Sequence, residues 1–336
     1  MLVTRLTLKD IAALAGVSRT TASRVLNGRG EVRPEVRARV EQVIANTGYR
    51  PLASAQSLVS QRTGVVGFIV PLGASTLFDD PYFGVLIRGV SQVSARRGIT
   101  VALFLFDEES DQETLIDQVV GPRRVDGLIV SAFHTRESLI DRLSEFDVPV
   151  VTLGPNSYPT AFGSVSVDNL AGGRIAGQYA ASLGRLPVAM IGGPEDTPSG
   201  RERREGFVAG LAETGVELDP RLFREGDFTR HSGELLMKEL LPLGPRTVFV
   251  ASDTMALGAL AVLAQEGLRV PDDVAVIGFD DLPSAAVADL TTVRQPIVEV
   301  ADAAFDTLLR QISDAGATEQ LMMPVELVKR RSTDIQ

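Results

Sequence analysis

The chain has 336 residues, 44% of them apolar, and a formal net charge of −10. It contains no cysteine, which excludes disulfides, thiolate catalysis and cysteine-based zinc sites. Its two histidines, His134 and His231, lie in no metal-binding pattern, so we predict neither a metal nor a cofactor. No apolar run has the length of a signal-peptide core or a membrane span, and we expect a cytoplasmic protein of two or three domains.

The first predicted element is a short helix that begins at Leu8. Thr7 and Asp10 have the spacing of a capping box, in which each side chain satisfies a backbone N–H of the other residue. Gly16 stands where the chain must reverse. The apolar stripe of this helix is predicted to comprise Ile11, Ala12, Leu14 and Ala15.

The second predicted helix follows at once, with Ser18 as its cap. One face is apolar and is expected to pack on the first helix; it comprises Ala22, Val25 and Leu26. The opposite face is polar and carries two cations; it comprises Arg19, Thr20, Ser23, Arg24 and Asn27. This pattern is typical of a helix-turn-helix, whose second helix enters the major groove of DNA. An ordinary helical hairpin with a solvated outer face has the same spacing.

The charge of the N-terminal segment distinguishes these two interpretations. Residues 1–62 contain ten arginines and lysines and four acids, a charge of +6, whereas the remaining 274 residues carry −16. A cationic unit attached to a strongly acidic body is typical of a chain in which one part binds a polyanion. We therefore predict that the first segment binds nucleic acid.

A third helix is predicted to begin with Pro34 and to end at Gly48. Its apolar positions, which complete a three-helix unit around Val25 and Leu26, are Val36, Val40, Val43 and Ile44. Residues 49–59 are rich in small side chains and have too few apolar positions to form a core.

From Val65 onward, apolar runs of strand length alternate with amphipathic helical stretches. Strands are predicted at 65–71, 99–106, 127–131, 148–153, 188–192, 247–251 and 274–279. Helices are predicted at 81–97, 111–121, 136–145, 168–184, 199–215, 230–241, 254–267 and 297–315.

These near-continuous runs of Val, Ile and Leu indicate parallel strands buried on both faces, in a doubly wound α/β architecture. The segment is large for one sheet, so two similar lobes are expected. Ligands of such folds bind outside the carboxyl ends of the strands, where polar residues therefore matter most. The sequence has neither a Walker loop nor a dinucleotide-binding glycine fingerprint.

Motifs along nearly the whole chain resemble those of the lactose-repressor (LacI/GalR) family of bacterial transcription regulators. They lie at residues 7–18, 24–28, 124–129, 167–169, 193–194, 203–207, 252–258, 267–271, 276–281 and 290–296. Each motif is weak alone, but their number, order and spacing make the resemblance specific.

The resemblance implies an N-terminal helix-turn-helix headpiece, a two-lobed periplasmic-binding-protein-like core of doubly wound parallel sheets, and a homodimer that reads a near-palindromic operator. The implied domains are 1–50 for the headpiece, 51–63 for a hinge helix and linker, and 64–336 for the core. The first lobe would comprise 64–162 and 293–322, and the second 164–291 and 325–332, with crossings near 162–165, 291–294 and 322–325. No heptad repeat follows Leu327, which favours a dimer over a tail-mediated tetramer.

Contacts with DNA are implied by position. The headpiece residues are Leu8, Ser18, Arg19, Thr20, Ser23, Arg24 and Asn27, and the hinge residues are Ala55 and Leu58. Leu58 corresponds to an apolar wedge that kinks the duplex from the minor groove, although a plain linker leucine is the alternative. The chain departs from the family at Leu52, Gln56 and Arg185, which replace the usual Asn, Arg and His.

Effector contacts are also implied by position, with Arg203 as a polar anchor and Asp280 as an acceptor for ligand hydroxyls. The other implied residues are Asp80, Tyr82, Phe83, Ser199, Phe228, Ser252, Asp253 and Gln295. Alternative roles are open for three of them: Asp253 is equally suited to cap a helix, and Phe83 and Phe228 to pack in a core.

We therefore predict a transcriptional repressor, not an enzyme, that responds to a sugar or sugar derivative. A secreted solute-binding protein is disfavoured by the cationic head and by the absence of a signal peptide. For an enzyme, the paired acids Asp79–Asp80 and Asp280–Asp281 are accompanied by no nucleophile with an adjacent base. The residues leave open whether the effector releases or promotes DNA binding.

Overall fold

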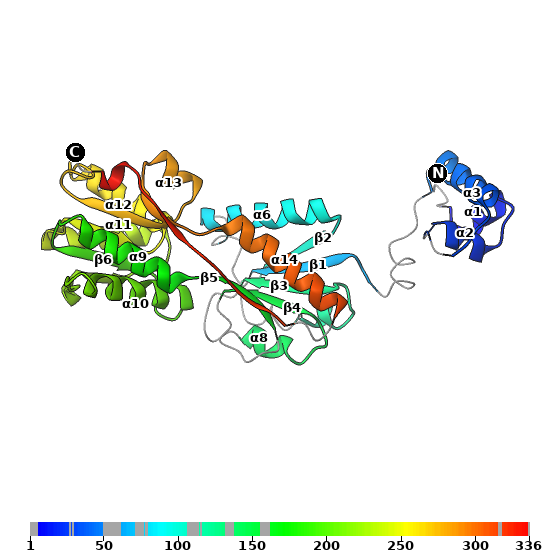
Figure 1. Cartoon of the computed structure of the whole chain (residues 1–336), viewed down its shortest axis with the longest axis horizontal. Helices are drawn as coiled ribbons and strands as arrows, with labels where there is room; N and C mark the ends of the chain where they lie inside the picture. Colours follow the sequence, from blue (N-terminus) through cyan, green and yellow to red (C-terminus); the bar gives the residue numbers. More distant parts are fainter. Residues whose placement is uncertain are drawn as a thin grey trace. The chain divides into compact units, whose positions relative to one another are not determined.

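The structure is a computed structural model that describes residues 6–26, 28, 30–49, 62–70, 77, 80–105, 114, 116–131, 138–154, 162–314 and 318–334 (Figure 1). The chain divides into an N-terminal unit, residues 1–63, and a core unit, residues 64–336. We describe each unit by itself. Among the described helices, none combines the length and the apolar character that a membrane span requires.

The N-terminal unit contains the three predicted helices: α1 (Leu8–Leu14), α2 (Arg19–Leu26) and α3 (Pro34–Thr47). Both halves of the Thr7–Asp10 capping box are present, and Gly16 adopts the left-handed φ of 63° that the reversal between α1 and α2 requires. Ala15, Val25 and Val40 form the small core of the unit.

Leu14 corrects the predicted apolar stripe of α1. Its side chain is 60% exposed, whereas Ile11, Ala12 and Ala15 are buried. At 3.6 residues per turn, Leu14 lies beyond the edge of the face that these three residues share, so it does not reach the core.

The first lobe of the core unit is built on an entirely parallel sheet in the order β11-β5-β4-β3-β1-β2. The strands are β1 (Val65–Val70), β2 (Thr100–Leu105), β3 (Gly127–Ser131), β4 (Val150–Leu153), β5 (Gly163–Val167) and β11 (Gln320–Met323). Helices α6 (Pro81–Arg97) and α14 (Ile297–Ser313) pack together over one face. The π-helical turn η1 (Ile116–Val120) and α8 (Ser138–Leu143) supply apolar residues that pack on the other face of the sheet.

The second lobe repeats this plan with the order β12-β10-β9-β8-β6-β7. Its strands are β6 (Val188–Gly192), β7 (Phe223–Glu225), β8 (Thr247–Val250), β9 (Ala275–Asp280), β10 (Thr291–Arg294) and β12 (Glu326–Val328). Helices α9 (Asn169–Ser182) and α10 (Pro198–Ala212) cover one face, and α11 (Arg230–Leu240) and α12 (Asp253–Gln265) cover the other. Short elements complete it: α13 (Pro283–Val287), η2 (Pro220–Leu222), η3 (Leu241–Leu243) and η4 (Arg331–Thr333).

The prediction of two similar α/β lobes is confirmed, with one qualification. Edge strand β12 pairs antiparallel with β10, so the second sheet is not wholly parallel. This pairing follows from the path of the chain, which reaches β12 directly from β11 of the first lobe instead of through a helix of the second (Figure 1).

The chain passes between the lobes three times: at Asp168, at 295–296 and at 324–325. The first two crossings lie a few residues later than the resemblance implied. The reason is that β5 stays in the first sheet up to Val167 and β10 stays in the second up to Arg294.

Arg185, one of the departures from the family pattern, forms hydrogen bonds with the backbone of another segment. Its guanidinium donates hydrogen bonds to the backbone carbonyls of Pro271, Asp272 and Asp273. The side chain therefore ties the segment before β6 to the segment before β9.

Candidate effector site and DNA-reading helix

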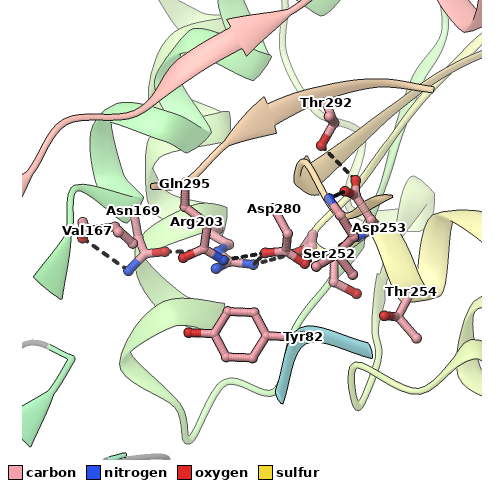
Figure 2. Close-up of polar contacts among 12 residues, drawn as sticks. Tyr82, Val167, Asn169, Arg203, Ser252, Asp253, Thr254, Asp280, Thr292 and Gln295 are labelled. Carbon is pink, nitrogen blue, oxygen red and sulfur yellow. Dashed lines mark hydrogen bonds and ion pairs between the residues drawn. The ribbon is translucent and has the colours of Figure 1, made fainter. Parts of the chain in front are cut away.

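Polar side chains gather at the carboxyl ends of the strands of the second lobe (Figure 2). Asp280 is the last residue of β9, Gln295 follows β10, and Ser252 follows β8. Arg203 approaches them from α10. All four side chains are buried, so the fold holds a polar cluster in a place from which water is largely excluded.

Arg203 is the centre of this cluster. Its Nε donates to Asn169 Oδ1 at 2.9 Å, and its Nη1 donates to the Ala251 carbonyl at 2.6 Å and to Asp280 Oδ1 at 3.3 Å. The guanidinium carbon lies 3.7 Å from the centroid of the Phe279 ring. The flat guanidinium is therefore held on three sides and across one face, which fixes its orientation.

Asp280 is held in an unusual backbone conformation, with φ of 118°. Its carboxylate accepts hydrogen bonds from Gln295 Nε2 at 2.6 Å and from the backbone N–H of Asp253 at 3.4 Å, besides the contact with Arg203. Burial raises the pKa of Asp280 to about 6, although the Arg203 charge opposes this shift. Backbone strain at a buried charged residue is typical of a functional position.

Asp253 is fully buried beneath the cluster. It accepts hydrogen bonds from Thr292 Oγ1 at 2.6 Å and from the Leu282 N–H at 2.8 Å. Gly278 makes this close fit possible, because a Cβ there would lie 2.3 Å from Asp253 Oδ1. Burial, and then the nearby Asp280 carboxylate, raise the pKa of Asp253.

The cap of α12 is Ser252, whose hydroxyl accepts from the Met255 N–H at 3.2 Å. Asp253 is the first residue of the helix, so its alternative role as the cap is wrong. Its side chain instead joins β10 and the segment after β9 to the start of α12.

The first lobe contributes Asp80 and Tyr82 from the start of α6. Asp80 caps the helix by accepting from the Tyr82 N–H at 3.0 Å, and burial raises the pKa of its carboxyl. Figure 2 shows the Tyr82 ring reaching toward Arg203 and Asp280. Desolvation and the Asp280 charge raise the pKa of the Tyr82 hydroxyl, which therefore stays a neutral donor.

The remaining predicted effector residues differ in position. Phe83 is 1% exposed within the core of the first lobe, which agrees with the packing alternative. Phe228 is partly buried, with φ of 66°, and its ring centroid lies 5.8 Å from the Arg203 guanidinium carbon. Ser199 is half-buried in the first turn of α10.

The predicted DNA-reading face of α2 is largely in solvent. Arg19, Thr20 and Arg24 are exposed, and Ser23 is half-buried. Ser18 Oγ accepts from the Thr21 N–H at 3.1 Å, which confirms it as the cap. Leu8 is half-buried at the start of α1. The other predicted contacts, Asn27, Ala55 and Leu58, and the departures Leu52 and Gln56 lie outside the described residues.

Two residues of the site were not predicted. Asn169 lies in α9 directly after the turn from β5, and it orients Arg203 while its Nδ2 donates to the Val167 carbonyl at 3.3 Å. Thr254 lies in the first turn of α12 and donates to Asp80. Both residues lie within motifs of the family resemblance, at 167–169 and 252–258, and both are polar residues shortly after a strand, but neither was predicted as a site residue.

Comparison with known proteins assigns both units. Residues 7–51 match the bacterial regulatory proteins of the lacI family, and residues 178–333 match the periplasmic binding protein-like domain. The transcriptional regulator CelR of Thermobifida fusca is 40% identical over 298 residues, 87% of each chain. The ribose operon repressor of Escherichia coli K12 is 32% identical over 334 residues, covering 97% of this chain and 99% of that one.

The chain belongs to the lacI family.

Solved structures of the lacI family agree with the fold. A CelR–cellobiose complex is 35% identical and has a TM-score of 0.76, over 98% of this chain and 100% of that one. A lac repressor dimer bound to operator and the anti-inducer ONPF is 27% identical, with a TM-score of 0.84 over 99% and 100%. This member of the lacI family is therefore a transcriptional regulator and not an enzyme.

Proposed function

We propose that this regulator is a cytoplasmic, dimeric repressor whose affinity for a near-palindromic operator is controlled by a sugar or sugar derivative. The observation that carries the proposal is the buried Arg203–Asp280 pair, flanked by Asn169 and Gln295 and approached by Tyr82 from the other lobe. A fixed guanidinium, a carboxylate and two amides offer alternating donors and acceptors, which is the chemistry that recognises neighbouring hydroxyl groups.

The charges of the site favour an uncharged effector. Asp80, Asp253 and Asp280 contribute carboxyl groups, and Arg203 contributes a guanidinium that contacts Asp280. A phosphorylated or carboxylated ligand would place a further negative charge beside these carboxyl groups in a buried place. The relatives are consistent with this chemistry: one structure holds cellobiose, and another relative is a ribose operon repressor.

For DNA, we propose that Arg19, Thr20 and Arg24 of α2 contact base edges, with Ser23 and Asn27 beside them and Leu8 and Ser18 near the backbone. Ala55 and Leu58 act at the hinge, Leu58 as the minor-groove wedge. The lac repressor dimer bound to operator supports this mode by similarity.

A thermal-shift screen tests the effector class. Purified protein is melted with cellobiose, ribose and glucose, with their phosphorylated forms, and with a purine base. We expect at least one neutral sugar to raise the melting temperature of the core, because a ligand that binds only the folded state stabilises it. Gln295→Leu should abolish this shift while leaving the sugar-free protein folded. A shift produced by the phosphorylated sugars or the purine alone would contradict the proposed class.

A further inference from the structure

A direct hydrogen bond joins the two lobes beside the polar cluster. Thr254 Oγ1, in the second lobe, donates to Asp80 Oδ1, in the first lobe, at 3.1 Å. Thr254 belongs to the first turn of α12, and Asp80 caps α6. The bond therefore connects the starts of two helices that belong to different sheets.

Each partner is fixed within its own lobe. The Asp80 carboxylate is held by the Tyr82 N–H at 3.0 Å. Thr254 is 5% exposed and stands between the fully buried side chains of Asp253 and Met255. Because neither side chain is free to follow the other, this hydrogen bond forms only when the lobes are at the separation seen here.

Charged groups of the second lobe act on Asp80 as well. The Arg203 charge favours ionised Asp80. The Asp80 carboxylate is thus attracted by Arg203 and repelled by Asp280, both in the second lobe, so the contact that joins the lobes here is the hydrogen bond from Thr254.

We propose that Thr254 is a positioning residue: it holds Asp80, and with it Tyr82, against the second lobe and so latches the lobes in the effector-binding arrangement. The effect on the effector rests on the proposed function, since Asp80 and Tyr82 approach the ligand from one lobe and Arg203 and Asp280 from the other. The latch itself is a property of the core and exists without a ligand.

The expected size of the effect follows from one hydrogen bond. A net contribution of the usual magnitude changes the ratio of latched to unlatched molecules by about two- to tenfold. Such a change is measurable as a distance distribution, and it leaves both lobes folded because no core residue is removed.

The absence of cysteine makes a labelling experiment direct. Asp147→Cys in the first lobe and Glu217→Cys in the second place one label on each lobe at exposed positions. Doubly labelled protein is mixed with excess unlabelled protein, so that a labelled chain pairs with an unlabelled one. The distance between the labels is then measured by pulsed electron paramagnetic resonance, without any ligand.

Thr254→Val keeps the shape of the side chain and removes the donor, and Thr254→Ser restores the donor. Thr292→Val is the matched control, because it removes a buried hydrogen bond to Asp253 that lies wholly within the second lobe. We expect Thr254→Val to reduce the latched population by about two- to tenfold, and Thr254→Ser and Thr292→Val to retain the wild-type distances. Wild-type distances in Thr254→Val would overturn the proposal.

The same proteins separate this inference from the proposed function. The distances are then measured with cellobiose as the probe. A wild-type protein that responds to no sugar in the thermal-shift screen refutes the proposed effector class, while the ligand-free distances still decide whether Thr254 latches the lobes.

Discussion

Replacing Arg203 with alanine is the most informative single perturbation of the core. The Arg203 and Asp280 side chains are only 7% and 5% exposed, so the substitution leaves the Asp280 carboxylate buried without its cation. It also removes the hydrogen bonds that Arg203 donates to Asn169 and to the Ala251 carbonyl. The guanidinium that packs on the Phe279 ring is lost as well. Because breaking one partner of a buried ion pair strands the other charge, we expect the free energy of unfolding of the core to fall by about 3–5 kcal/mol.

The assay is urea unfolding followed by circular dichroism, in a double-mutant cycle with Asp280→Asn. Once Asp280 is neutral, Arg203→Ala no longer strands a charge, and its cost should be smaller by about 1–3 kcal/mol. Arg174→Ala is the matched control, since Arg174 forms an exposed pair with Glu213 on the same lobe and should leave the unfolding midpoint nearly unchanged. Equal midpoints for Arg203→Ala and Arg174→Ala would refute the account of the cluster.

Three further predictions concern the pH dependence, the reading helix and the hinge. The pKa of Asp280 is raised from 3.8 to about 6 in the folded state, so the free energy of unfolding falls as the pH rises through this window. Relative to Asp280→Asn, the wild type should lose up to about 3 kcal/mol of stability between pH 4 and 7. A stability difference between the two proteins that does not change with pH in urea unfolding would contradict this. Arg24→Ala should weaken operator binding by about 1–3 kcal/mol and random DNA much less, and equal losses in a filter-binding assay would make Arg24 a phosphate contact. Leu58→Ala should lower specific affinity and the DNA bend together, and an unchanged bend angle in a phasing assay would reduce the hinge to a tether.

Elements with a strong, uninterrupted signal were predictable. The helix from Pro81 to Arg97 has proline at its first turn and a glycine after its end, and its predicted bounds are those observed. The strands at 127–131 and 188–192 also have the predicted bounds, because both are fully buried central strands. In these segments, local pattern and tertiary burial agree.

Weak strands were missed for physical reasons. β5 reads Gly-Ser-Val-Ser-Val and is buried without an apolar run, because α14 and β11 cover its small residues. β11 and β12 are edge strands of four and three residues, and two residues of β11 and one of β12 are exposed. Their existence depends on partners far away in the sequence, which no local pattern contains.

The candidate site was predictable in position more than in detail. Arg203, Asp280 and Gln295 were expected from the resemblance, and the structure brings them within hydrogen-bonding distance. The sequence could not predict that Ser252 caps α12 while Asp253 accepts a hydrogen bond from Thr292. Both residue types cap helices well, and only the fold decides which one does so. The contact of Thr254 with Asp80 spans 174 residues and depends on how the lobes meet.

The central claim is that a sugar bound at the Arg203–Asp280 cluster changes operator affinity. The most direct measurement is fluorescence anisotropy of a labelled operator, titrated with wild-type protein and with Gln295→Leu, with and without the neutral sugar that stabilises the wild type. The account predicts that the sugar changes wild-type affinity by about five- to 150-fold and leaves that of Gln295→Leu unchanged, while both proteins bind the operator equally well without sugar. A full sugar response in Gln295→Leu, or no response in wild type, would contradict it.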